Sequence, residues 1–407
     1  MQPYIALGSG LRSAGHQVTI GTHSNFREMA ETAGLQFSPV EGNPREILQT
    51  EEGRKWIEAD SNPFSFFAGL IRLSLSLFDL LARDAWEACK NAEAIIYSPL
   101  GLCCHSIAEK LKIPACMAPL QPLSATTFFA SPMFPPVSLG KFYNVSTHKA
   151  AGQLIWQPFR KAFNRWRRDT LNLPPYPLWG PLTTMRKKNE PILNGFSPSV
   201  LPRPADWRSG CYITGYWFLD HENTWEPPQD LLRFLSAGEP PVYIGFGSMS
   251  ERDPKGLSQL LVRALQLSEQ RGILLSGWAE LPKEDLPENI FVIDSLPHDW
   301  LFPRMAAAVH HGGAGTTAAV FRAGVPNIVI PFFGDQHFWG AQVFKLGAGP
   351  KPISRKRLTA EALAHAITRA VSDANLQKQA NMLGEKIRSE NGVRRAVEIL
   401  ETKILRS

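Results

Sequence analysis

The segment His-His-Gly-Gly-Ala-Gly-Thr-Thr at residues 310–317 has the residue types and spacing that bind a phosphate group. It follows the apolar residues 305–309 and precedes residues 318–323, so we predict a strand, a glycine-rich turn and the start of a helix. Glycines let the backbone approach an anion, and the unpaired N–H groups of a first helical turn point toward it. The pattern therefore predicts a phosphate site built largely from backbone amides.

A second segment, Pro-Phe-Phe-Gly-Asp-Gln at residues 331–336, repeats this layout. The apolar residues 327–331 predict a strand, and Phe333 and Gly334 form the predicted turn. Asp335 and Gln336 then open the next helix, where a carboxylate and an amide suit the hydroxyl groups of a sugar. The alternative is that both residues cap a surface helix.

These two segments, with Leu-Pro-His-Asp-Trp-Leu-Phe-Pro at residues 296–303, resemble the donor-binding signature of the nucleotide-sugar glycosyltransferases. The likeness is to the family 1 type, and most specifically to the branch of sterol 3-β-glucosyltransferases and bacterial antibiotic and glycolipid glycosyltransferases. It covers residues 2–26 and about 242–369 and is weak between them. The resemblance implies an α/β protein of the GT-B fold, with two Rossmann-like domains facing across a cleft. From the residues alone, an ordinary doubly wound sheet with glycine turns remains the alternative.

The expected donor-binding residues follow the predicted strands of the second half of the chain. They are Gly247, Ser248, Leu296, His298, His311, Gly313, Ala314, Gly315, Thr316, Asp335 and Gln336.

Residues 313–316 are assigned to the diphosphate, and the resemblance implies that His311 donates to the phosphate or the sugar. Leu296 and His298 are expected to frame the base and the ribose. Three alternatives stay open: His311 merely ends a strand, His298 caps a helix, and the pair at residues 247–248 is a plain strand-to-loop turn.

Length and pattern predict two α/β domains in a chain of 407 residues. We predict an acceptor-binding domain at residues 1–224 and a donor-binding domain at residues 225–407. By resemblance, part of the last helical stretch, residues 375–405, crosses back to the first domain.

The five cysteines are an odd number without a C-x-x-C pair, which argues against a disulfide framework or a zinc site. No signal peptide is visible, so we expect a cytoplasmic protein. The apolar residues 64–82 carry Arg72 and Asp79, which favours an amphipathic helix lining a cleft over a membrane span.

Residues 141–208 carry twelve Lys and Arg against three acids. Within them Trp156, Phe159, Phe163 and Trp166 recur at helical spacing, with basic residues such as Arg160, Lys161, Arg165, Arg167 and Arg168 between them. Such a helix can lie on an anionic membrane, so peripheral contact with the inner face of the membrane is one hypothesis. The other is that the aromatic residues are core and the arginines face solvent.

At the N-terminus the sequence matches the resembling family only from Gln2 to Leu7. In that family a strand and a Gly-rich turn come first, and the aspartate that deprotonates the acceptor would lie before residue 1. We therefore expect an N-terminally incomplete chain whose activity is uncertain. His23 follows the predicted strand at residues 18–22, and we assign it to the acceptor side, either as a contact or as the base.

The function implied is inverting transfer of a hexose, preferably glucose from UDP-glucose, to a hydroxyl of a hydrophobic acceptor. The apolar residues 64–81 and Phe128, Phe129, Phe134 and Phe142 suit a sterol or other lipid, and equally an aromatic or polyketide natural product. The sequence has no Asp-x-Asp motif, so neither a metal nor a cofactor is expected. An epimerase-like enzyme and a catalytically impaired UDP-sugar-binding protein remain alternatives, whereas nucleic-acid binding lacks a supporting motif.

Overall fold

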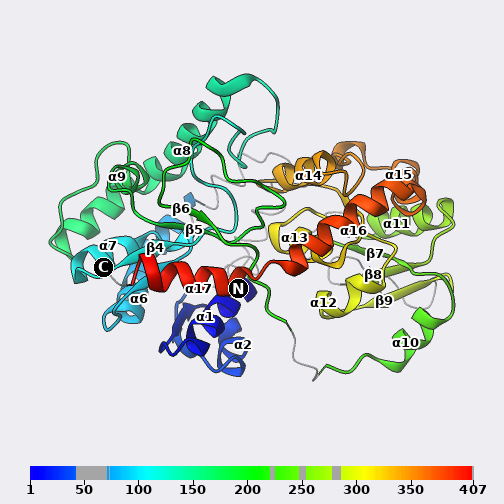
Figure 1. Cartoon of the computed structure of the whole chain (residues 1–407), viewed down its shortest axis with the longest axis horizontal. Helices are drawn as coiled ribbons and strands as arrows, with labels where there is room; N and C mark the ends of the chain where they lie inside the picture. Colours follow the sequence, from blue (N-terminus) through cyan, green and yellow to red (C-terminus); the bar gives the residue numbers. More distant parts are fainter. Residues whose placement is uncertain (43–70, 73, 221–224, 247–253, 277–285, 406–407) are drawn as a thin grey trace.

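The chain folds into two halves, each built on a parallel sheet (Figure 1). The computed structural model describes residues 1–42, 71–72, 74–220, 225–246, 254–276 and 286–405.

The first half has two sheets among its described residues. Four parallel strands lie in the order β3-β4-β5-β6, and β1 and β2 form a separate parallel pair. These strands are β1 (Thr19–Thr22), β2 (Gln36–Pro39), β3 (Ile95–Tyr97), β4 (Ala115–Met117), β5 (Ile192–Asn194) and β6 (Cys211–Ile213). The helices are α1 (Gln2–Ser13), α2 (Arg27–Thr32), α6 (Phe78–Cys89), α7 (Cys103–Leu111), α8 (Gly140–Asp169) and α9 (Pro181–Lys187).

The second half has a five-stranded parallel sheet in the order β11-β10-β7-β8-β9. Its strands are β7 (Val242–Gly245), β8 (Gly272–Leu275), β9 (Ile290–Ile293), β10 (Ala307–His310) and β11 (Asn327–Val329). Its helices are α10 (Gln229–Ser236), α11 (Pro254–Leu267), α12 (His298–Leu301), α13 (Ala314–Ala323), α14 (Gln336–Lys345), α15 (Ala360–Ser372) and α16 (Ala374–Ser389). Described helices follow β7, β9, β10 and β11, and the strands β7, β10 and β11 are buried and largely apolar, as expected of a parallel sheet covered on both faces.

The last helix, α17 (Gly392–Lys403), lies against the first half and packs on α1 (Figure 1). The stretch predicted as one long helix is divided at residues 390–391, because the Asn391 side chain accepts from the N–H of Arg394 and starts a new helix. Beside this break Glu390 accepts hydrogen bonds from Ser197 and Ser199, both at 2.7 Å. The break therefore ties the end of the second half to the first.

Aromatic side chains join the two halves at the carboxyl ends of their strands. Phe129, beyond β4, contacts Phe338 of α14 with ring centroids 5.5 Å apart. Phe196, just after β5, contacts Trp339 of the same helix at 6.2 Å. In open parallel sheets ligands bind at these carboxyl ends, so the two binding edges face each other.

The aromatic residues of α8 belong to the core of the first half. Trp156, Phe163 and Trp166 are buried, and their rings pack on one another and on Phe78 and Tyr176. The hypothesis that this aromatic face lies on a membrane is therefore wrong, and its interpretation as core is confirmed.

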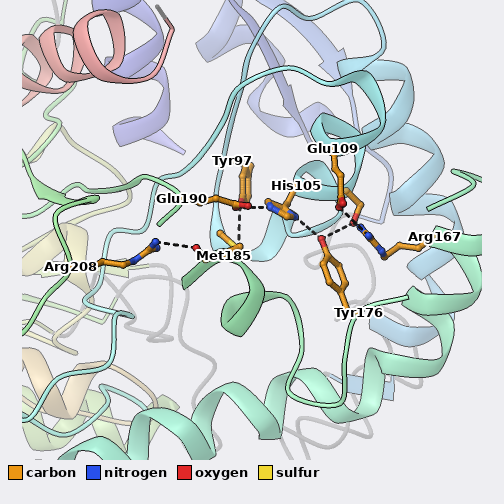
Figure 2. A network of polar contacts seen from close by, with 9 residues as sticks. Tyr97, His105, Glu109, Arg167, Tyr176, Met185, Glu190 and Arg208 are labelled. Carbon is orange, nitrogen blue, oxygen red and sulfur yellow. Dashed lines mark hydrogen bonds and ion pairs between the residues drawn. The ribbon is translucent and has the colours of Figure 1, made fainter. Parts of the chain in front are cut away.

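Arg167 corrects a second expectation about α8, because it is buried and does not face solvent. Its guanidinium donates to Ser106 Oγ at 2.7 Å and to Glu109 Oε2 at 3.0 Å, and it lies 3.8 Å from the ring centroid of Tyr176 (Figure 2). Tyr176 in turn contacts His105, which pairs with Glu190 (Figure 2). This network fixes α8 to α7.

Replacing Arg167 with Gln should lower the free energy of unfolding by about 2–4 kcal/mol, because it leaves Glu109 without its cation in a partly buried site. Urea denaturation measures this loss. Arg168→Gln is the matched control: its pair with Asp169 is exposed, so the loss should stay below about 1 kcal/mol. Equal losses in the two variants would contradict a structural role for the buried arginine.

Candidate active site

The turn between β10 and α13 has the geometry expected of a phosphate loop. Gly312 adopts φ of 87°, which favours glycine, and a Cβ there would lie 2.6 Å from Cγ1 of Val329. It would also lie 3.1 Å from the carbonyl oxygen of Gln336, so the turn packs against the second predicted loop. The two glycine-containing loops therefore form one site.

The first turn of α13 presents its backbone N–H groups without a side-chain cap. Gly313 occupies the N-cap position, so it brings no side chain of its own to these amides. A Cβ added at Gly315 would meet no atom of the described chain within 4 Å, so the space beside this turn is open. The positive end of the helix dipole and its free amides thus face open space, which suits an anion.

Two buried polar atoms beside this turn have no hydrogen-bond partner among the described residues. They are Nδ1 of His311 and Oγ1 of Thr317. Burial also lowers the pKa of His311, which favours a neutral imidazole. His311 lies in the turn, one residue beyond the end of β10, and its ring covers Gly313. The turn therefore has two polar side-chain atoms without partners, on His311, which is partly exposed, and on Thr317, which is fully buried.

The structure adds His310, which sequence reasoning passed over in favour of its neighbour. His310 is fully buried, its Nε2 lies 3.0 Å from Oδ1 of Asn327, and its Nδ1 accepts from the N–H of Gly312 at 3.0 Å. Burial, followed by the charge of His311, lowers the pKa of His310 to about 3. The available signal was Asn327, a polar residue at the start of an otherwise apolar strand.

The second loop places Asp335 and Gln336 differently from each other. Asp335 is the N-cap residue of α14, and its Oδ2 accepts from the indole N–H of Trp339 at 3.0 Å. Burial raises the pKa of this carboxyl group. Gln336 is buried, and its Oε1 accepts from the N–H groups of Phe332 and Phe333. The side-chain oxygen of Gln336 thus holds the turn, which is a structural role that the sequence did not reveal.

His298 and Leu296 lie beside β9 at the same edge of the sheet. His298 is the first residue of α12, and its ring stacks on Phe302 with centroids 4.5 Å apart. Leu296 packs partly buried against the neighbouring core. The predicted residues Gly247 and Ser248 lie outside the described residues, as do residues 64–70 and 73 of the apolar segment 64–82.

His23 follows β1 in the first half of the chain. Its Nδ1 lies 2.8 Å from the carbonyl oxygen of Val40, which can only accept, so Nδ1 carries the hydrogen. The neutral ring therefore keeps a lone pair on Nε2. This tautomer can accept a proton from a ligand at the edge of the first half.

The described parts of the chain contain neither a metal-binding cluster nor a membrane-spanning helix. No group of three or more His, Cys, Asp and Glu side chains there is arranged to hold a metal ion. No helix there is long and apolar enough to cross a membrane. The five cysteines, all described, are free thiols.

Two family models match the chain. Residues 1–130 match the glycosyltransferase family 28 N-terminal domain, and residues 277–402 match the erythromycin biosynthesis protein CIII-like C-terminal domain. The second match contains both glycine-containing loops.

Curated relatives include sterol 3-beta-glucosyltransferases of Pichia angusta and Cryptococcus neoformans, each 38% identical over 98% of this chain. The chain spans 32% and 26% of their respective lengths. Among solved structures, the calicheamicin glycosyltransferase CalG4 superposes with a TM-score of 0.70 at 16% identity, covering 98% of this chain and 94% of that one. A glycotransferase of kitacinnamycin gives 0.73 at 18% identity, with 99% and 96% covered. These structures establish the fold, with two Rossmann-like domains.

Asp335→Asn should stabilise the protein at pH 7 by about 1 kcal/mol, because the amide oxygen keeps the bond from Trp339 without a buried charge. Folding raises the pKa of this carboxyl group, so its ionised form lowers the free energy of unfolding. This destabilisation is complete above the raised pKa and disappears as the pH falls toward 4, where the group is protonated. Thermal melts at pH 7 and pH 4 should therefore show the gain only at pH 7. Asp373→Asn, which keeps an N-cap acceptor for α16, should show no gain. An equal gain in stability at pH 7 and at pH 4 would contradict a destabilising effect of the Asp335 charge.

Proposed function

This chain belongs to the nucleotide-sugar glycosyltransferases with the GT-B fold, and from this membership we propose that it transfers glucose from UDP-glucose to a hydroxyl of a sterol or related lipid. The sterol follows from the curated relatives, whose names state that acceptor. The solved structures, at under a quarter identity, support only the fold.

The uncapped first turn of α13 is the observation that carries the proposal. Its amides, the dipole of a ten-residue helix, and the unpartnered atoms of His311 and Thr317 all border the same turn. A diphosphate would satisfy the free amides and the partly exposed His311 together, since it brings negative charge and several acceptor oxygens. Because the same groups stabilise charge that develops on the leaving diphosphate, they lower the barrier to transfer. No step requires a metal.

Asp335 is proposed to hold the sugar. Its Oδ2 is fixed by Trp339, which leaves the second carboxylate oxygen to accept from a sugar hydroxyl. The Gln336 bonds to Phe332 and Phe333 keep this helix start in place. Gln336 contributes to donor binding mainly through this support.

The acceptor is proposed to lie against apolar side chains beyond β3 and β4. Leu100 is 98% exposed and Phe128 is 61% exposed, and both follow strands whose carboxyl ends face the second half. Covering such side chains with the rings of a sterol removes apolar area from water. An epimerase, which handles only the nucleotide sugar, has no use for this surface.

The chemical step joins the acceptor oxygen to the anomeric carbon and breaks the bond from that carbon to the diphosphate oxygen. The electron pair of the broken bond stays on UDP, and the hydroxyl proton must pass to a base. We assign His23 to the acceptor side, where its Nε2 lone pair can take or orient this proton.

The test is UDP release from UDP-glucose, measured with and without a sterol. We expect release that depends on the sterol and a glucosylated sterol by mass spectrometry. Asp335→Ala should reduce turnover at least about 100-fold and change the Kd for UDP less than about threefold, because its contact is with the sugar.

Sterol-independent release would favour hydrolysis or epimerisation instead. UDP binding without any release would leave a donor-binding protein. A His23→Gln variant that keeps full activity would exclude this histidine as the base.

We further propose that the protein contacts a membrane peripherally through the exposed side of α8, and not through its buried aromatic face. Leu154, Ile155, Leu178, Trp179 and Leu182 form an exposed apolar patch. The two segments adjoin, since Gln153 and Gln157 of α8 donate to the carbonyl oxygens of residues 179 and 178. Within residues 141–188 the exposed charged side chains are basic except for Asp169. An apolar patch with basic surroundings suits an anionic lipid surface, where a sterol would be met.

Replacing Leu154, Trp179 and Leu182 together with Ser should reduce sedimentation with phosphatidylserine-containing liposomes at least about tenfold. Activity toward a detergent-dispersed sterol should be unchanged. The control is Leu267→Ser with Phe344→Ser, two exposed apolar residues elsewhere, which should sediment as the wild type does. Equal sedimentation of both variants would exclude the patch as the contact.

A further inference from the structure

His310 is a second histidine in the phosphate loop with no route to the ligand, because it is fully buried behind the turn. Both of its ring nitrogens are engaged within the protein, by Asn327 and by Gly312. An apolar residue at this position could fill the same space but could make neither hydrogen bond.

The hydrogen bonds determine its tautomer. The side-chain N–H of Asn327 donates to the carbonyl oxygen of Val325 at 3.2 Å, which turns its Oδ1 toward His310. An amide oxygen only accepts, so Nε2 of His310 carries the hydrogen. Nδ1 then carries the lone pair, as required to accept from the N–H of Gly312. Each of the three hydrogen bonds, from Asn327 to Val325, from His310 to Asn327 and from Gly312 to His310, therefore joins one donor to one acceptor.

The bond to Gly312 fixes the direction of the turn. It directs the N–H of Gly312 inward at the residue where the backbone takes its positive φ. A Cβ at the same residue would overlap Val329, so the turn is also held from the side of β11. The amides that follow, from Gly313 into α13, then lead away from the core toward open space.

We propose that His310 is a positioning residue that, through Asn327 and Gly312, sets the amides of the α13 turn in register with the diphosphate. This inference rests on the proposed function, because it concerns binding of the UDP diphosphate. His310 does not touch the ligand, and it does not exchange a proton during transfer. Its effect is confined to the diphosphate end of the nucleotide.

The experiment compares the binding of UDP and of uridine by calorimetry. Uridine lacks the diphosphate, so it reports on the base and ribose contacts alone. His310→Leu should weaken UDP binding about tenfold, the loss of roughly one buried hydrogen bond, and change uridine binding less than twofold. His310→Gln should recover most of the affinity, because its amide can accept from Gly312 and donate to Asn327.

The matched control is Val309→Ala, a buried residue of the same strand whose loss costs stability without removing a polar contact. It should lower Tm and leave the ratio of UDP to uridine affinities unchanged. Asn327→Ala serves as the second variant if His310→Leu does not fold, and it should weaken UDP binding selectively, since His310 then lacks the partner that fixes its tautomer.

Equal weakening of UDP and uridine, or none, would overturn the proposal. Wild-type protein that binds UDP but transfers no glucose would overturn the proposed function alone. Wild-type protein that does not bind UDP would overturn both.

Discussion

The site depends on the passage of the backbone from β10 into α13. A parallel strand must reverse direction within a few residues to start its helix, and here it does so through Gly312 with φ of 87°. The space beside that residue is taken by Val329 and by the backbone of Gln336, so only glycine fits. The same packing brings the two loops together, and the amides of the first turn of α13 owe their direction to this turn.

A second constraint is the joining of the two halves. Phe338 and Trp339 of α14 follow the second glycine-containing loop, and both contact aromatic residues of the first half. The segment from α16 to α17 then returns to the first half, where Glu390 accepts from two serines and α17 packs on α1. The carboxyl ends of the two sheets are thereby held facing each other, and the proposed transfer between two bound substrates requires this arrangement.

The sequence predicted the parallel α/β architecture and both loops because their signals are local. Glycine runs after apolar strands specify a turn wherever they occur, and the periodicity of the flanking residues specifies helix or strand. The environment of Arg167 is not local: its partners Ser106 and Glu109 are 61 and 58 residues away in the chain. A basic residue beside four aromatic residues on one helix is compatible with core or with surface, and only the packing of α7 against that helix decides. The role of Gln336 could not be predicted from the sequence either, since its side-chain oxygen accepts hydrogen bonds from the preceding turn and this depends on how the turn folds.

The energetics of the site support its interpretation independently of any motif. Nδ1 of His311 and Oγ1 of Thr317 are buried without partners, and each such group costs about 1–3 kcal/mol. Asp335 is close by along the same edge with a pKa raised by burial, which is again unfavourable to the free protein at neutral pH. His310, equally buried, has both nitrogens satisfied. Unfavourable terms therefore fall on His311, Thr317 and Asp335 and are absent from His310. That division is expected when a ligand, rather than the protein, supplies the missing partners.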